Sequence, residues 1–162
     1  MCYNTHVEPQ KDDRAYMYEA LAEAQAAYEH GEVPVGAVAV HNHYVVGRGH
    51  NRKEELADPT AHAELLALRE AAQALRSWRL GGVTLYSTME PCPMCAGAMV
   101  LARLPRLVYA VDDPKSGASG SLFDITRSPR LNHQVQVTKG VLAEEVRELL
   151  DSFFAELRSP GH

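Results

Sequence analysis

Residues 83–111, VTLYSTMEPCPMCAGAMVLARLPRLVYAV, contain a strand, a helix and a second strand in close succession. Residues 83–88 are a short run that is typical of a buried strand. Pro91 favours the start of a helix, because proline suits the first helical turn, and Pro105 favours its end. Residues 106–111 form an apolar run and predict the next strand. The unit predicts two parallel strands joined by a right-handed helical crossover.

The sequence on both sides of this unit supplies the remaining elements. Before it, we expect a helix with apolar residues from Met17 to Tyr28, strands over 33–40 and 44–47 with a turn at 41–43, and a helix opened by Asp58-Pro59-Thr60. After it, we expect a loop over 112–122, a weak strand over 135–141 and a helix over 143–158. A hairpin followed by alternating helices and strands predicts an α/β fold, with three α/β/α layers and a mixed five-stranded sheet. We expect one domain over 1–162 that begins with a polar tail, 1–13.

Composition and charge limit the classes of function. The chain has 162 residues, of which 46% are apolar and 23% charged, an ordinary mixture for a globular domain. No apolar run approaches the roughly 20 residues that span a bilayer. The tail lacks a signal-peptide core and the Arg-rich character of a transit peptide, so we expect a cytoplasmic protein with no membrane partner. The net charge of −5 argues mildly against a nucleic-acid partner, because phosphate contacts need clustered basic residues.

The cysteines indicate a metal or redox site. There are three, an odd number for a disulfide scaffold, and Cys92 and Cys95 lie within four residues of each other. We interpret Cys2, in the polar tail, as an incidental thiol. At an i, i+3 spacing in a first helical turn, both thiolates of the close pair reach one metal ion.

A second motif, His62-Ala63-Glu64, also opens a predicted helix. Side chains two residues apart on a helix point roughly 200° apart. His62 and Glu64 therefore reach one metal-bound water only if the metal lies beyond the helix end. That arrangement aims two helix N-termini, with their partial positive charges, at the same point.

The two motifs together predict catalytic zinc chemistry. With His62, Cys92 and Cys95 as ligands, one zinc ion per subunit keeps a fourth position for water and lowers the pKa of that water towards about 7. Glu64 is placed to accept the water proton and to deliver it to the substrate. Such general acid–base work is typically worth ~10²–10⁴-fold in rate.

H-A-E followed by P-C-x-x-C resembles the signature of the cytidine-deaminase-like zinc superfamily. Within it, the chain most resembles the bacterial tRNA adenosine deaminases, from about Glu19 to Phe154. The resemblance is carried by EVPVGAV (32–38), GHNR (49–52), DPTAHAE (58–64), TLYSTMEPCPMCAGAM (84–99), KSGASGSL (115–122) and NHQVQV (132–137).

The resemblance implies hydrolytic deamination of adenosine to inosine at the wobble position of an arginine tRNA anticodon. Zinc-bound hydroxide would attack C6 of a flipped adenine, with Glu64 as the proton shuttle. The partners implied are the anticodon stem-loop and a second copy of the chain in a homodimer. The implied substrate contacts are a hydrogen bond from Asn51 to the target nucleoside, Val35 and Met89 lining the base pocket, Asp113 on a neighbouring sugar, and Phe154 beside the extruded bases.

Two departures from the family pattern concern RNA binding. After Phe153-Phe154 the last helix has Arg158 as its only base, and Val111-Asp112 replaces a more basic pair before Asp113. Fewer basic residues predict fewer phosphate contacts and a weaker dependence of RNA affinity on salt.

Other interpretations remain open at this stage. The nearest is a small-molecule deaminase of guanine or cytosine on the same fold. The Cys pair is also compatible with a redox pair, or with a structural zinc site that takes His50 or His133 as its fourth ligand. A non-catalytic, zinc-stabilised interaction domain is the alternative from a different class. Asn51 and Asp113 also fit ordinary turns, and one of the two adjacent phenylalanines is expected in the core.

Overall fold

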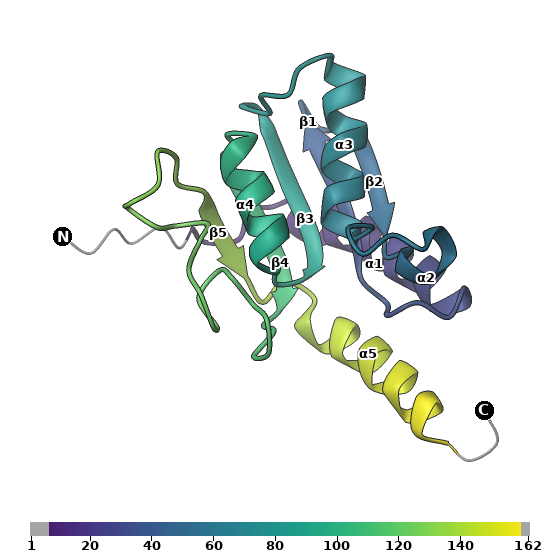
Figure 1. Cartoon of the computed structure of the whole chain (residues 1–162). Coiled ribbons are helices and arrows are strands. Elements are labelled where there is room, and N and C mark those ends of the chain that lie inside the picture. Colours follow the sequence, from purple (N-terminus) through teal and green to yellow (C-terminus); the bar gives the residue numbers. More distant parts are fainter. Residues whose placement is uncertain (1–6, 160–162) are drawn as a thin grey trace.

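A five-stranded sheet with the strand order β2-β1-β3-β4-β5 is the centre of the molecule (Figure 1). The structure is a computed structural model, and it describes residues 7–159. Its strands are β1 (Gly36–His41), β2 (Tyr44–His50), β3 (Val83–Met89), β4 (Arg106–Val111) and β5 (Gln136–Lys139). Its helices are α1 (Asp13–Glu29), α2 (Lys53–Leu56), α3 (Ala63–Leu75), α4 (Pro93–Leu101) and α5 (Ala143–Arg158).

The strand directions confirm the predicted mixed sheet. β1 runs antiparallel to both β2 and β3, whereas β3, β4 and β5 run parallel to one another. The parallel pair β3–β4, with α4 between them, is the crossover that residues 83–111 predict. β4 and β5 are also parallel, although residues 112–135, which join them, contain no helix.

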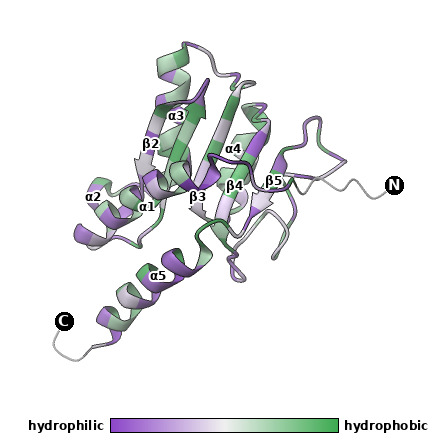
Figure 2. Ribbon diagram, turned by 180° about the vertical axis from the view of Figure 1, so that it is seen from behind, coloured by the Kyte–Doolittle hydropathy of each residue, from purple (hydrophilic) through white to green (hydrophobic). Residues whose placement is uncertain are grey.

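Alternate side chains of the strands enter two different cores. In β1, Ala37 and Ala39 pack into the core that contains buried residues of α3 and α4. Val38 and Val40 point to the other face and pack with buried residues of α1 and α5. Seen from behind, α1 lies in front of the sheet and α3 lies beyond it (Figure 2). The predicted three-layer α/β/α architecture is therefore confirmed.

Several element boundaries differ from those predicted. β1 begins at Gly36 rather than at residue 33, because Pro34 has no N–H to offer a neighbouring strand. β2 extends beyond residue 47 to His50, since its last residues still pair with β1. The short helix α2 was not predicted at all. The strand predicted over 135–141 is limited to β5.

α4 is shorter than predicted. It ends at Leu101 instead of near Leu104, because Arg103 adopts a left-handed backbone conformation with φ of 60°. A residue with positive φ cannot continue a right-handed helix. The turn that follows closes when Leu104 N–H donates to the Met99 carbonyl at 3.0 Å.

Two glycines in β2 let α3 lie directly on the strand backbone. A Cβ atom on Gly47 would come within 2.2 Å of the Ala67 carbonyl oxygen, and one on Gly49 within 2.3 Å of the Ala63 carbonyl oxygen. Only glycine permits so close an approach. The packing fixes the first turn of α3 against the sheet, and this turn carries the H-A-E motif.

The start of the described chain is hydrogen-bonded to β5. Val7 N–H donates to the Val137 carbonyl at 3.0 Å, and the Thr138 hydroxyl donates to the Val7 carbonyl. At the start of α1, Asp13 is 1% exposed and accepts two hydrogen bonds of 2.8 Å from Arg106 in β4.

Cys2 lies outside the described residues. Within residues 7–159, no helix has the length and apolar character needed to cross a membrane.

Candidate active site

His62, Cys92 and Cys95 come together where α3 and α4 begin, at the same end of the sheet (Figure 1). His62 Nδ1 lies 3.6 Å from Cys92 Sγ and 3.5 Å from Cys95 Sγ. All three ligand atoms lie within 4.8 Å of one another. The structure thus places the three predicted ligands close enough to hold one ion.

Local helix geometry explains this convergence. His62 is the N-cap residue of α3 and Cys92 is the N-cap residue of α4, and both have extended backbone conformations. Pro93 occupies the first helical position of α4, where its missing N–H costs no hydrogen bond. Two helix N-termini, with their partial positive charges, therefore meet at the cluster, which favours negative charge there.

Glu64, in the first turn of α3, is 3% exposed. Burial raises the pKa of its carboxyl to about 7, because the low-dielectric surroundings disfavour the charged form. Its Oε1 is buried and has no hydrogen-bond partner among residues 7–159. A buried carboxyl that titrates near neutral pH and has a free oxygen suits proton transfer.

The chemistry of the donor set fits zinc. The hydrogen bond with Cys95 lowers the pKa of the Cys92 thiol to about 4, against the effect of burial. The same contact and burial raise the pKa of Cys95 far above its usual range. The pair by itself holds one thiolate and one thiol, and a dication between them would favour ionisation of both. One imidazole and two thiolates are typical ligands of Zn²⁺.

A cavity of about 140 Å³ opens beside this cluster. It is lined by Val33, Val35, Asn51, Lys53, His62, Glu64, Met89, Glu90, Cys92, Asp113 and Ser116. Four of the five residues that the resemblance assigns to substrate therefore share one cavity with Glu64. The fifth, Phe154, is not among the lining residues. Sequence reasoning missed Val33, Lys53, Glu90 and Ser116.

Asn51 also has a structural role. Its amide oxygen accepts from Ala63 N–H at 3.0 Å, and its amide nitrogen donates to the Val33 carbonyl at 3.2 Å. An asparagine amide has two donors and two acceptor sites, so one of each remains for a ligand. Asn51 thereby ties the start of α3 to the segment before β1 while its side chain lines the cavity.

Asp113 is also engaged within its own loop. Its Oδ1 accepts from the N–H groups of Lys115 and Ser116 at 3.0 and 3.3 Å, and its Oδ2 accepts from the Ser116 hydroxyl at 2.7 Å. These bonds close the turn that places Ser116 at the cavity. The contact of Asp113 with a neighbouring sugar stays a prediction.

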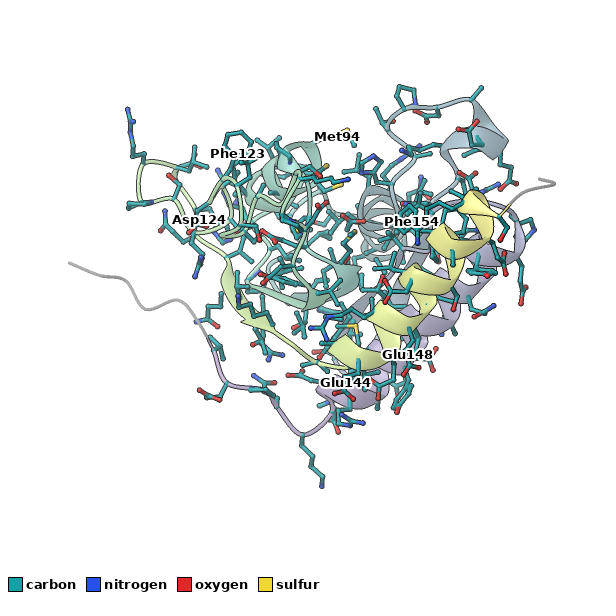
Figure 3. The ribbon with its side chains drawn as sticks, turned by 90° about the horizontal axis from the view of Figure 1, so that it is seen from below. Met94, Phe123, Asp124, Glu144, Glu148 and Phe154 are labelled. Atoms are coloured by element: carbon teal, nitrogen blue, oxygen red, sulfur yellow. The ribbon has the colours of Figure 1, made fainter. Side chains whose placement is uncertain are left out.

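Phe154 lies on α5, which projects from the end of the sheet where the cluster lies (Figures 1 and 3). Its side chain is 38% exposed, whereas the neighbouring Phe153 is buried and packs edge-on against Tyr28 with ring centroids 5.8 Å apart. The expectation that one of the two phenylalanines lies in the core is therefore met by Phe153.

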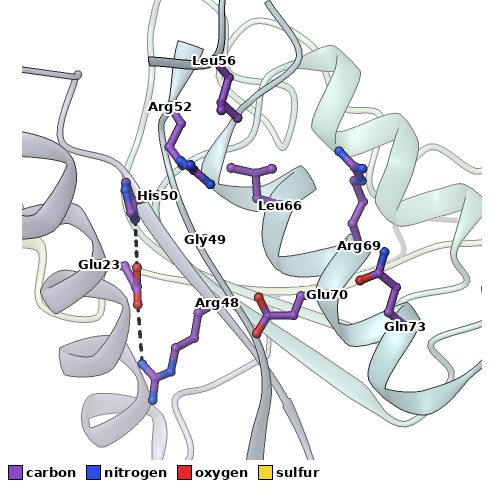
Figure 4. A pocket seen from close by; sticks show the side chains of 10 residues that line it. All are labelled: Glu23, Arg48, Gly49, His50, Arg52, Leu56, Leu66, Arg69, Glu70 and Gln73. Carbon is purple, nitrogen blue, oxygen red and sulfur yellow. Dashed lines mark hydrogen bonds and ion pairs between the residues drawn. The ribbon is translucent and has the colours of Figure 1, made fainter. Parts of the chain in front are cut away.

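A larger groove, of about 410 Å³, lies between α1, β2 and α3 (Figure 4). Glu23 lies there between Arg48 and His50, at 3.8 and 3.1 Å, and its carboxylate offsets the charge of Arg48. The groove contains none of the three ligand residues. His50 and His133, the alternative fourth ligands, are bonded elsewhere, to Glu23 and to the Leu104 carbonyl. The smaller cavity is therefore the better candidate for the active site.

Comparison with known proteins agrees with this geometry. Residues 11–158 match the family model of the MafB19-like deaminases. A tRNA-specific adenosine deaminase from Bacillus subtilis (strain 168) is 51% identical over 146 residues, which cover 90% of this chain and 91% of that protein. Another, from Aquifex aeolicus (strain VF5), is 47% identical over 86% of this chain and 92% of its own length.

Solved structures share the fold. One, from a study of A-to-I editing by tRNA:A34 deaminases at the wobble position of transfer RNA, has a TM-score of 0.81 and 45% identity, over 84% of this chain and 99% of that chain. A guanine deaminase from Nitrosomonas europaea has a TM-score of 0.73 at 24% identity, over 93% and 87% of the two chains. This second likeness concerns the fold alone.

The fold and the His-Cys-Cys cluster, with the buried Glu64 beside it, define the class of the protein as a hydrolytic deaminase with the cytidine-deaminase-like fold. Within this class, the chain belongs to the MafB19-like deaminases and, among them, to the family of tRNA-specific adenosine deaminases.

Proposed function

We propose that this protein converts adenosine to inosine at the wobble position of a tRNA anticodon, with an arginine tRNA as substrate. The observation that carries the proposal is the small cavity that Glu64 lines together with His62 and Cys92, because the buried Oε1 of Glu64 has no hydrogen-bond partner among the described residues. The relatives named for action on tRNA adenosine support the choice of substrate.

The residues at and beside the cavity have different roles in the proposed reaction. His62, Cys92 and Cys95 would hold a zinc ion, which supplies a water of lowered pKa as the nucleophile. Glu64 would accept one proton of the attacking water and give it to the ring nitrogen. It would then take the second proton from the new hydroxyl on C6 and give it to the amino group, which leaves as ammonia. Burial raises the pKa of the Glu64 carboxyl, and this favours the uptake of a proton there.

Other side chains orient the base. Val35 and Met89 present apolar surface to its ring, and the remaining polar groups of the Asn51 amide hydrogen-bond the nucleoside. A base that fills so small a cavity displaces water from it, and this strengthens each polar contact that the base makes there.

The size of the cavity explains why we expect an adenosine in an anticodon loop, and not a paired one, as the substrate. Pockets for drug-sized ligands usually have roughly 300–1,000 Å³, so a cavity of about 140 Å³ suits one base at a time. An adenine must therefore leave its stack to enter. Extrusion from an anticodon loop avoids the few kcal/mol that a paired base requires.

Direct sequencing of the wobble position tests this proposal. Purified enzyme is incubated with an anticodon stem-loop that contains A at the wobble position, with the same sequence in a duplex, and with free adenosine. We expect inosine in the stem-loop only. Rapid release of ammonia from free guanine or cytosine, with the stem-loop unedited, would instead support a small-molecule deaminase.

We also propose that the enzyme acts in the cytoplasm as a homodimer. Large apolar side chains on α4 and in the segment after β4 are exposed, namely Met94, Leu101, Leu122, Phe123 and Leu131. Met94 and Phe123 lie along one side of the molecule in Figure 3. Exposed apolar side chains of this kind favour burial against a second copy. Sedimentation that gives only monomer at micromolar concentration, with full activity, would contradict the dimer.

A further inference from the structure

Glu90, directly before the Pro91-Cys92 motif, is a buried carboxylate that the proposed chemistry does not use. It is 2% exposed, although it lines the edge of the cavity. The N–H groups of Asp113, Ser119 and Ser121 donate to it at 3.0, 2.9 and 3.1 Å, and the Ser121 hydroxyl also donates to it. One side chain thus holds the loop 113–121 at both of its ends.

The loop also packs closely on this carboxylate. A Cβ atom on Gly117 would come within 2.4 Å of Glu90 Cδ and Oε1 and within 2.5 Å of the Asp113 carbonyl oxygen. Gly117 therefore permits the close contact on which the hydrogen bonds depend. Beyond it, Asp113 and Ser116 form one wall of the cavity.

We propose that Glu90 is a positioning residue, which fixes the loop 113–121 as the wall that receives the nucleotide next to the target base. The inference rests on the proposed function, because it assigns this wall to a polynucleotide substrate. Glu90 acts through the loop and leaves the proton transfers to Glu64. It therefore governs how well the flanking nucleotide binds and which one is accepted.

The chemistry of the contact requires a carboxylate. Each of its two oxygens accepts two of the four bonds: Oε1 from Asp113 and the Ser121 hydroxyl, Oε2 from Ser119 and the Ser121 amide. A glutamine presents N–H groups to two of these donors and loses their bonds. Hydrogen bonds to a charged acceptor are stronger than neutral ones, so the loop is held more firmly by Glu90 than it would be by glutamine.

The test compares Glu90→Gln with Tyr86→Phe, which removes a buried hydrogen bond to Asp13 on the other side of the sheet. We expect Glu90→Gln to raise KM for the stem-loop about tenfold while kcat changes less than about threefold. The Glu90→Gln variant should also discriminate less than the wild type between stem-loops with different flanking nucleotides. Tyr86→Phe should leave KM and this discrimination unchanged.

Two readouts do not depend on turnover. In Glu90→Gln, hydrogen exchange at the amides of Asp113, Ser119 and Ser121 should accelerate, and the zinc content should stay that of the wild type. Gly117→Ala displaces the same loop by steric contact and should reproduce both the exchange and the KM effect. Gly81→Ala, where an added Cβ meets nothing within 4 Å, is its control.

Unchanged exchange and KM in Glu90→Gln would overturn the proposal, and so would a fall in kcat with KM unchanged, or loss of zinc. If Glu90→Gln fails to fold, Gly117→Ala decides by the same readouts. Failure of the wild-type enzyme to edit any stem-loop would refute the proposed function, whereas the exchange data would still show whether Glu90 fixes the loop.

Discussion

At the scale of single residues, the proposed zinc site depends on two cysteines. Cys92 and Cys95 offer two of the three atoms that could hold a metal ion. We expect the double variant Cys92→Ala, Cys95→Ala to lose nearly all zinc, because one histidine does not hold the ion. Metal analysis of the purified protein gives the result, with Cys2→Ala as the control that keeps one zinc per chain. Stoichiometric zinc in the double variant would refute the ligand assignment.

Glu64→Gln should keep the fold and the zinc but lower kcat by about 10²–10⁴-fold, because an amide cannot carry the proton. Single-turnover assays on the stem-loop measure this loss. Glu70→Gln, an exposed position on the same helix, serves as the control and should stay near wild type. Activity of Glu64→Gln within a few-fold of wild type would remove Glu64 from the mechanism.

The sequence predicts those parts of the site that depend on residues close together in the chain, and it does not predict contacts between distant segments. The positions of His62, Cys92 and Cys95 follow from helix starts and an i, i+3 spacing, and the structure brings these residues together. The bonds of Asn51 and Glu90 join segments between 12 and 31 residues away. Spacing along one helix gives no indication of such partners, so these roles needed the structure.

At the scale of elements, the contact of β2 with α3 positions the first turn of α3. We expect Gly49→Ala to lower the free energy of unfolding by about 1–3 kcal/mol, since the added Cβ would come within 2.3 Å of the Ala63 carbonyl oxygen. Urea unfolding measures the difference, with Gly81→Ala as the matched control. Equal stability of the two variants would show that α3 can move away at no cost.

The longer elements were predictable, because apolar periodicity and prolines mark them. α2 was not, since four residues, Lys53–Leu56, are too few to show a period. Its first N–H groups are bound by the buried carboxylate of Glu32, at 3.1 and 3.0 Å. A contact across more than twenty residues therefore stabilises this helix, and propensity alone gives no sign of it.

At the scale of the whole molecule, the pair Asp13–Arg106 joins α1 to β4 on the face of the sheet opposite α3. Burial raises the pKa of Asp13, but hydrogen bonds from Arg106, Gln10 N–H and Tyr86 outweigh it and hold this pKa below the ordinary 3.8. Because the folded pKa is the lower one, the ionised carboxylate stabilises the fold above pH 3.8. This contribution is lost as pH falls through the folded pKa.

Unfolding in urea between about pH 2 and pH 6 checks this dependence. Asp13→Asn should remove the part of the acid slope that belongs to Asp13. At neutral pH it should also destabilise the protein by about 3–5 kcal/mol, because it leaves Arg106 buried without its anionic partner. An acid slope identical to that of the wild type would show that Asp13 does not contribute to it.

The bonds between Val7 and β5 have a consequence for biosynthesis. Their partners, Val137 and Thr138, are translated about 130 residues after Val7. At roughly 5–20 residues per second, the first residues wait on the ribosome for several seconds or more before their partners exist. A nascent chain stalled before β5 would present β4 as an open strand edge, which is a template for aggregation. Protease sensitivity of ribosome-bound chains should therefore drop sharply only once residues 136–139 have left the exit tunnel.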